Sequence, residues 1–186
     1  MCFVSNLIAR ADRFAEQAHG SIGQLRKYSG APYITHPRAV ARLVMSVPHT
    51  EIQVAAALLH DVVEDTPFTL KQIERAFGRP VARMVDELTE RRLPNTGNRA
   101  TRQALEVERL SSISAEAMTV KVADIIDNAS AIFKYDKSFA PLYLLEKRNQ
   151  LQSLSKADQD LLLLGSKTIH EAILAVQAET KVSHKS

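Results

Sequence analysis

The sequence predicts an all-α fold, a single-domain bundle of about eight to ten helices. Apolar residues recur at intervals of three and four along almost the whole chain, which is the spacing of one buried helix face. No run of alternating apolar and polar residues convincingly indicates a strand. No Gly-rich or Pro-rich linker divides the 186 residues, and this length suits one domain. We therefore expect residues 1–186 to form one helical domain.

The first three helices are each predicted by an apolar face, and two of them by a start signal. Apolar residues from Val4 to Ala18 lie on one face of the first helix. His36-Pro37 opens the second helix, because a proline in the first turn costs no backbone hydrogen bond. Thr50 is the expected N-cap of a third helix over residues 51–64. That helix is apolar nearly all round and should therefore be central and buried.

Two shorter helices and an exposed loop are expected next. Thr69 and Gln72 form a capping-box pattern, and Gly78 is the matching stop signal at the other end of that helix. Pro80 starts the following helix. Residues 91–98 include proline, glycine and two asparagines, a composition typical of a loop.

Four helices are predicted in the rest of the chain. Helical spacing of apolar residues returns over residues 99–110 and again over residues 116–133. Pro141 opens another helix, and a last helix is expected over residues 159–179. The polar tail, residues 180–186, is expected to fray because few contacts hold a chain end.

The composition is that of a globular protein, with 45% hydrophobic and 24% charged residues. The net charge of +3 suits an anionic ligand such as a nucleotide but is too small to indicate nucleic-acid binding. The lone Cys2 cannot close an intrachain disulfide, and no signal peptide is recognisable. No apolar run approaches the ~18 residues of a membrane span. We expect a cytoplasmic protein without a membrane partner, and the sequence does not decide whether it forms homo-oligomers.

The end of the third predicted helix carries an unusual acidic cluster. His60, Asp61, Glu64 and Asp65 fall within six residues of an otherwise apolar helix. The three acids are spaced by three and four, so their carboxylates share one helical face. Like charges on one face repel each other and are costly when partly buried. Since a divalent cation would neutralise them better than scattered surface lysines, we expect a metal site here.

Asp124 and His36 extend the expected metal site. Asp124 lies among apolar residues of a predicted helix, with Asn128 on the same face, and a buried carboxylate needs a cation, a metal or several donors. Two histidines and two aspartates form a mixed nitrogen and oxygen set that suits Mn²⁺, Fe²⁺ or Zn²⁺ better than Ca²⁺. Taken alone, His36 would be an ordinary helix-start histidine and Asp124 a satisfied buried polar group. The joint pattern favours a metal site.

Three segments resemble a known family in their order and spacing: RKYSGAPYITHP (26–37), AALLHDVVEDT (56–66) and VKVADIIDN (120–128). On these residues the chain resembles the HD superfamily, and within it the hydrolase domain of the RelA/SpoT alarmone enzymes. The resemblance is closest to the stand-alone small alarmone hydrolases and covers about residues 8–155. It implies a helical HD-type domain that hydrolyses alarmones without synthesising them.

The resemblance also implies roles for individual residues. It places the metal ligands, usually of Mn²⁺, on His36, His60, Asp61 and Asp124. It places the catalytic acidic pair, which would orient a water and take its proton, on Glu64 and Asp65. It places contacts to the nucleotide on Arg26, Lys27 and Asn128. The implied reaction removes the 3′-pyrophosphate from a (p)ppGpp-type alarmone and gives GDP or GTP and pyrophosphate.

Two further groups have open interpretations. Tyr143 and Lys147 are four residues apart and would either complete the substrate pocket from a later helix or form a surface pair. Four arginines surround the expected loop and would either attract an anionic substrate or form a solvated basic patch: Arg91, Arg92, Arg99 and Arg102.

The chain departs from the family pattern beside the expected metal site. Tyr28 lengthens the basic segment, Ile125 replaces a common basic residue, and Asp127 stands where His or Tyr is common. These changes concern the substrate wall, so an adenosine alarmone or NADPH remains an alternative substrate of the same site. A non-catalytic alarmone-binding module is the third alternative. The acidic pair speaks against it, because a binder needs no proton acceptor beside the metal.

Overall fold

The computed structural model describes residues 6–90, 97–136 and 139–183, which form ten helices. Their bounds are α1 Asn6–Ser21, α2 Thr35–Val44, α3 Glu51–Leu59, α4 Val62–Asp65, α5 Leu70–Phe77, α6 Arg79–Leu88, α7 Arg99–Ser112, α8 Ala115–Tyr135, α9 Ala140–Ser153 and α10 Gln159–Ser183. The described residues contain no strand, only an isolated bridge between Leu25 and Pro32. The predicted all-α fold is therefore confirmed.

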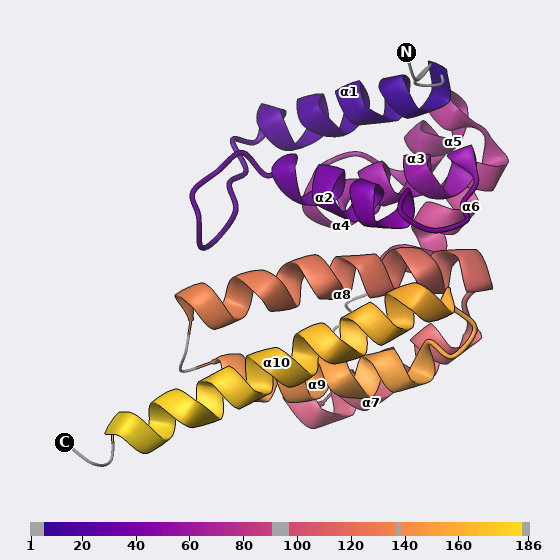
Figure 1. The fold of residues 1–186 in the computed structure, drawn as a ribbon. Helices are drawn as coiled ribbons and strands as arrows, with labels where there is room; N and C mark the ends of the chain where they lie inside the picture. The colour runs from indigo at the N-terminus through magenta and orange to yellow at the C-terminus, as the bar shows by residue number, and fades with distance from the viewer. Residues whose placement is uncertain (1–5, 91–96, 137–138, 184–186) are drawn as a thin grey trace.

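Helix α8 lies at the centre of the molecule, between two groups of helices (Figure 1). It contacts α2, α3 and α6 on one side and α9 and α10 on the other. Its place follows from its composition, because Val120, Val122, Ala123 and Ile125 are all fully buried. The sequence thus carries Asp124, which lies among these residues, into the core.

Capping boxes fix the starts of two helices as predicted. Oγ1 of Thr50 accepts the N–H of Gln53 at 3.2 Å, and the N–H of Thr50 donates to Oε1 of Gln53 at 2.9 Å. At the start of α5, the N–H of Thr69 donates to Oε1 of Gln72 at 2.8 Å. The first box fixes the residue at which α3 begins. It therefore also fixes the direction in which the end of α3, next to His60, faces.

The chain after α6 differs from the prediction mainly at its end. Helix α10 runs to Ser183, so part of the tail expected to fray from residue 180 is helical. Residues 91–96 of the expected loop, and residues 184–186, lie outside the described residues. Asn98 caps α7 by accepting the N–H of Thr101 at 3.0 Å. In the described ranges, no helix combines the length and apolar character needed to cross a membrane.

The third predicted helix, residues 51–64, is wrong as a continuous element. It is interrupted at His60 and Asp61 and becomes α3 and α4. Nδ1 of His60 donates to the Ala57 carbonyl at 2.8 Å. In an unbroken α-helix that carbonyl would accept the N–H of residue 61, so the side chain competes with the helical ladder. At this break, Nε2 of His60 lies 3.1 Å from Oδ2 of the next residue, Asp61.

Helix α10 packs along α8 through one apolar face, and one pair of its leucines tests this packing. Leu161 is 1% exposed and Leu163 is 71% exposed. We expect Leu161→Ala to lower the free energy of unfolding by about 2–5 kcal/mol, because it leaves a cavity in the core. Leu163→Ala should change it by no more than about 0.5 kcal/mol. Denaturant unfolding of both variants measures the difference, and equal losses would contradict this packing.

Candidate active site

Four side chains from distant parts of the sequence converge beside α8. His36 comes from the first turn of α2, and Asp124 from the middle of α8. His60 and Asp61 come from the break between α3 and α4. Nε2 of His36 lies 3.3 Å from Oδ1 of Asp124 and 3.5 Å from Oδ2 of Asp61. Nε2 of His60 lies 3.1 Å from Oδ2 of Asp61 and 3.9 Å from Oδ1 of Asp124. The structure thus brings together the four residues predicted to bind a metal.

The unbonded ring nitrogen of His60 indicates that this cluster requires a positive charge. Nε2 of His60 is buried and has no hydrogen-bond partner among the described residues. The other nitrogen donates to the Ala57 carbonyl, so Nε2 of the neutral ring carries a lone pair. That lone pair faces the carboxylates of Asp61 and Asp124. The arrangement is unfavourable unless positive charge lies between the nitrogen and the oxygens.

The pKa values of His36 and His60 also indicate that the cluster requires a positive charge. Burial lowers the pKa of His36, but its hydrogen bonds to Asp124 and Asp127 and the charge of Asp61 outweigh burial and raise it to about 9. The pKa of His60 is also raised, against the effect of burial, by the charges of Asp61 and Asp124. A divalent cation meets this demand while both rings stay neutral, as a metal ligand must be.

The donor atoms fit one divalent ion. One ligand atom each from His36, His60 and Asp124 can be chosen so that all three lie within 4.8 Å of one another. Nitrogen and oxygen ligands about 2.0–2.2 Å from a common ion are themselves roughly 3–4 Å apart. The mixed imidazole and carboxylate set is one that divalent transition metals accept. The structure therefore supports a divalent-metal site on these side chains.

Neighbouring donors hold both carboxylates in place. Asp124 accepts hydrogen bonds from Nζ of Lys121 at 2.9 Å and from Nδ2 of Asn128 at 2.6 Å. Oδ2 of Asp61 accepts the hydroxyl of Tyr33 at 2.6 Å. Burial opposes ionisation of Asp124, but the charge of Lys121, a hydrogen bond from His36 and the charge of His60 hold its pKa well below the ordinary value. Asp124 is therefore a carboxylate, ready to bind a cation.

The predicted acidic pair lies on α4, next to the converging side chains. Glu64 accepts a backbone N–H at 3.2 Å, and burial, followed by the charge of Asp61, raises its pKa. Asp65 accepts Nε2 of Gln24 at 2.8 Å. Oε1 of Gln24 in turn accepts Nδ1 of the buried His19 at 2.7 Å. Glu64 thus has a pKa shifted toward neutrality, and Asp65 is held by a hydrogen-bonded chain.

A cavity of about 230 Å³ adjoins the cluster and is lined by the predicted basic segment. Its walls include Arg26, Lys27, Tyr28, Asn128, Phe139 and Tyr143. Asn128 also donates to Asp124, and Tyr33, another lining residue, donates to Asp61. These two contacts join the cavity directly to the histidine and aspartate cluster.

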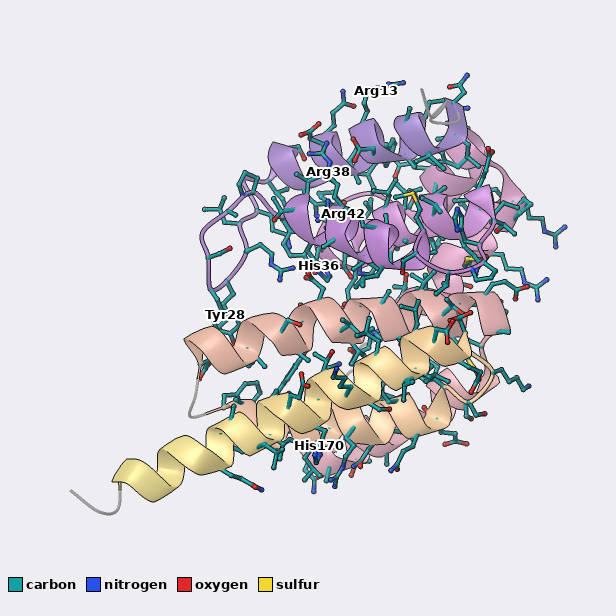
Figure 2. The ribbon with its side chains drawn as sticks, in the orientation of Figure 1. Arg13, Tyr28, His36, Arg38, Arg42 and His170 are labelled. Carbon is teal, nitrogen blue, oxygen red and sulfur yellow. The ribbon has the colours of Figure 1, made fainter. Side chains whose placement is uncertain are left out.

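Tyr28 lines this cavity from the loop after α1. Figure 2 shows it on the loop after α1, beside the end of α8. Its hydroxyl donates to Oδ2 of Asp136, the residue after the last turn of α8, at 3.3 Å. Lys27 stands at the rim, with its side chain 73% exposed and Nζ 3.7 Å from Asp136.

Of the two residues predicted on the later helix, only one lines the cavity. Tyr143 lines the cavity and Lys147 is not among its lining residues. Nζ of Lys147 instead donates to Oε1 of Gln150 at 2.9 Å and lies 5.4 Å from the centre of the Tyr143 ring. Both side chains are half-buried, so they do not form a fully exposed pair, and their contact with substrate stays a prediction.

The arginines around the expected loop make local contacts where they are described. Arg99 pairs with Glu146 at 2.6 Å, and Arg102 donates to the Gly97 carbonyl at 2.8 Å. Arg91 and Arg92 lie outside the described residues. A role in attracting substrate stays a prediction.

The cavity beside the histidine and aspartate cluster is smaller than other cavities of the described structure, so volume alone does not identify the active site. A groove of about 510 Å³ lies between α9 and α10, and one of about 410 Å³ lies among α1, α2 and α3. Neither is lined by any predicted site residue. The smaller cavity carries the stronger case, because it alone among these three adjoins convergent histidines and carboxylates.

The contacts of three residues were not predicted from the sequence. Asp127 binds both His36 and Arg26, each at 2.7 Å. Lys121 and Tyr33 bind the two clustered aspartates. Lys121, Asp124 and Asp127 are spaced by three, so a shared helix face was visible in the sequence. Their partners in other parts of the chain could not be seen in the sequence.

Comparison with known proteins places the chain among HD proteins. Residues 11–140 match the family model of the HD domain, against the expected range of 8–155. Over 127 residues the chain is 42% identical to the human guanosine-3′,5′-bis(diphosphate) 3′-pyrophosphohydrolase MESH1, covering 67% of this chain and 68% of that protein. Over 125 residues it is 39% identical to a probable guanosine-3′,5′-bis(diphosphate) 3′-pyrophosphohydrolase of Synechocystis sp., covering 66% of this chain. The chain spans only 16% of that longer relative.

Solved structures share the fold. A metazoan orthologue of SpoT, described as hydrolysing ppGpp, superposes with a TM-score of 0.80 at 24% identity, over 92% of this chain and 98% of that one. The protein lmo0812 of Listeria monocytogenes superposes with a TM-score of 0.61 at 26% identity, over 78% of this chain and 99% of that one. Both comparisons concern the arrangement of helices.

Proposed function

Because the chain belongs to the HD domain family, we propose that it is a metal-dependent hydrolase that removes the 3′-pyrophosphate from guanosine 3′,5′-bis(diphosphate) and related alarmones. The observation that carries the proposal is the convergence of buried His36, His60 and Asp124 with half-buried Asp61, which leaves Nε2 of His60 without a hydrogen-bond partner in the described structure. The two pyrophosphohydrolases reported above support this choice of substrate.

The proposed reaction is a hydrolysis at the 3′ position. A water oxygen forms a bond to the phosphorus that is attached to the 3′ oxygen, and the bond between that phosphorus and the 3′ oxygen breaks. The water loses a proton and the 3′ oxygen gains one. The products are the nucleoside 5′-diphosphate or 5′-triphosphate with a free 3′ hydroxyl, and pyrophosphate.

The proposed ion is Mn²⁺, bound by His36, His60, Asp61 and Asp124, because imidazole and carboxylate ligands suit it. When bound, a divalent cation lowers the pKa of water toward ~7 and neutralises charge on a phosphoryl group. Glu64 and Asp65 then orient the attacking water and take its proton, and a raised pKa makes Glu64 the better acceptor near neutral pH.

The cavity of about 230 Å³ is the proposed site for the nucleoside. Arg26 would face the base or the phosphates and Asn128 the ribose. Tyr28 and Tyr143 offer aromatic faces for the base. Lys27, at the rim, supplies a positive charge for a phosphate group.

A nucleotide panel with metal removed and restored tests the proposal. We expect metal-stripped protein to be inactive and Mn²⁺ to restore release of pyrophosphate from ppGpp and pppGpp. Because the base wall departs from the family pattern, ppApp and NADPH belong in the same panel. Chromatography of the products gives the rate with each substrate.

The control is ppGpp with Mn²⁺ and no protein, and the other outcomes are equally informative. Faster turnover of ppApp would keep the reaction and correct the base. Faster release of phosphate from NADPH would keep hydrolysis but change the bond that is cleaved. Tight binding of ppGpp without any product would replace the enzyme by a binding module. Equal activity with and without metal would remove the ion from the reaction.

A further inference from the structure

One carboxylate oxygen connects the candidate metal site to the candidate nucleotide cavity. Oδ2 of Asp127 lies 2.7 Å from Nδ1 of His36 and 2.7 Å from Nη1 of Arg26. Its side chain is 21% exposed and that of Arg26 is 16% exposed, so both contacts are largely shielded from water. Asp127 follows Asp124 by three residues on α8, which turns both carboxylates toward α2.

The first contact fixes the chemical form of His36. A carboxylate can only accept, so Nδ1 of His36 must carry the hydrogen. In the neutral ring the lone pair is then on Nε2, the atom that faces Asp61 and Asp124. A carboxylate behind a metal-binding histidine fixes its tautomer and raises its basicity. Without Asp127, the ring would be free to place its hydrogen on the wrong nitrogen.

The second contact places Arg26. Its guanidinium donates to Asp127 and also lines the cavity of about 230 Å³. An arginine side chain has many rotamers, and holding one of them in advance reduces the entropy lost when an anionic ligand binds. Asp127 therefore presents Arg26 to the cavity in a fixed position.

We propose that Asp127 is a positioning residue that sets the tautomer of His36 for the ion and holds Arg26 for the nucleotide through the same oxygen. The proposal rests on the proposed function, because it takes His36 as a metal ligand and Arg26 as a nucleotide contact. A merely structural ion pair between α8 and the loop after α1 would stabilise the fold. It would set neither metal affinity nor a tautomer.

Metal affinity without nucleotide is the first test. Titration calorimetry of metal-stripped protein with MnCl₂ should show binding weakened about 10–100-fold in Asp127→Ala. The matched control is Asp12→Ala, because Asp12 is also paired with an arginine, Arg38, at 2.7 Å. That variant should bind Mn²⁺ as wild type does. Unchanged affinity in Asp127→Ala would overturn the proposal.

The tautomer of His36 is the second test, and it requires no turnover. In metal-free protein with ¹⁵N-labelled histidine, at a pH high enough to make the His36 ring neutral, NMR should show His36 protonated on Nδ1, with the signal assigned by its loss in His36→Gln. Asp127→Ala should shift that signal toward the other tautomer. An unchanged tautomer would overturn the proposal.

The coupling to Arg26 is tested at saturating Mn²⁺. Asp127→Ala and Arg26→Ala should each raise KM for the nucleotide, and the double variant should raise it no further than the worse single variant. Arg26→Ala alone should leave Mn²⁺ affinity unchanged. Fully additive losses in KM would overturn the shared role of Asp127.

Two further variants keep the test decisive. If Asp127→Ala does not fold by circular dichroism, Asp127→Asn replaces it. Asn keeps an acceptor oxygen and the volume but loses the charge, so a smaller loss of Mn²⁺ affinity is expected and none would overturn the proposal. His36→Ala separates the two failures: if it also keeps wild-type affinity, the metal site of the proposed function is wrong.

Discussion

Replacing His60 or Asp124 by alanine is expected to abolish both metal retention and turnover. Each side chain supplies a buried donor atom to the same centre, with Nε2 of His60 3.9 Å from Oδ1 of Asp124. Removing Asp124 also leaves the buried ammonium of Lys121 without its carboxylate partner. Elemental analysis after dialysis measures retained metal, and product chromatography after chelation and addition of Mn²⁺ measures turnover.

His49→Ala is the matched control for these two variants. His49 is exposed and contacts only its own turn in the described structure, through the Val47 carbonyl at 2.7 Å. It should retain metal and turnover. Asp124→Asn and His60→Gln replace the alanine variants if those fail to fold. Wild-type turnover in a His60 or Asp124 variant after chelation and metal addition would make the ligand assignment wrong.

Glu64→Gln is expected to keep the metal and lose most of the rate. Glutamine preserves the shape of the side chain and an oxygen that can accept the backbone N–H of Glu90, but it cannot take a proton. A positioned general base contributes roughly 10²–10⁴-fold, so kcat should fall by a factor in that range. Because Glu64 acts on the water and not on the nucleotide, KM should change little.

Steady-state kinetics and elemental analysis of the same preparation separate rate from metal loss. Glu108→Gln, at an exposed position of α7, makes the same chemical change away from the site and should leave kcat unaltered. Near-normal turnover in Glu64→Gln would exclude Glu64 as the base. Asp65→Asn, measured in parallel, would then show whether the other carboxylate takes the proton.

The sequence predicted the helices well because their signals are local. The capping box at Thr50 joins residues three apart, and the apolar face of each helix repeats every three or four residues. The break after α3 was missed because no glycine or proline marks it, and apolar Val62 and Val63 follow directly after His60 and Asp61. At this break the His60 side chain bonds to the Ala57 carbonyl and competes with the helical ladder, a contact that no propensity scale contains.

The sequence drew attention to candidate site residues where a charge was out of place. An aspartate in the apolar run of α8, and acids at the end of α3, are anomalies that a single sequence displays. The role of Asp127 was not visible in this way. Its two partners are 91 and 101 residues away, and only the packing of α8 against α2 and the loop after α1 brings them to it. Sequence thus indicated which residues are chemically unusual, and the fold indicated which of them touch.

The origin of the four converging side chains has a consequence for folding. They belong to α2, to the break between α3 and α4, and to α8, which meet only when the hydrophobic core has formed. An ion held there acts as a non-covalent cross-link that the denatured chain cannot form. Such an ion stabilises the native state by about 2.7 kcal/mol when its free concentration is a hundred times the dissociation constant. The cell's supply of divalent metal would therefore govern how long the protein survives as well as how fast it works.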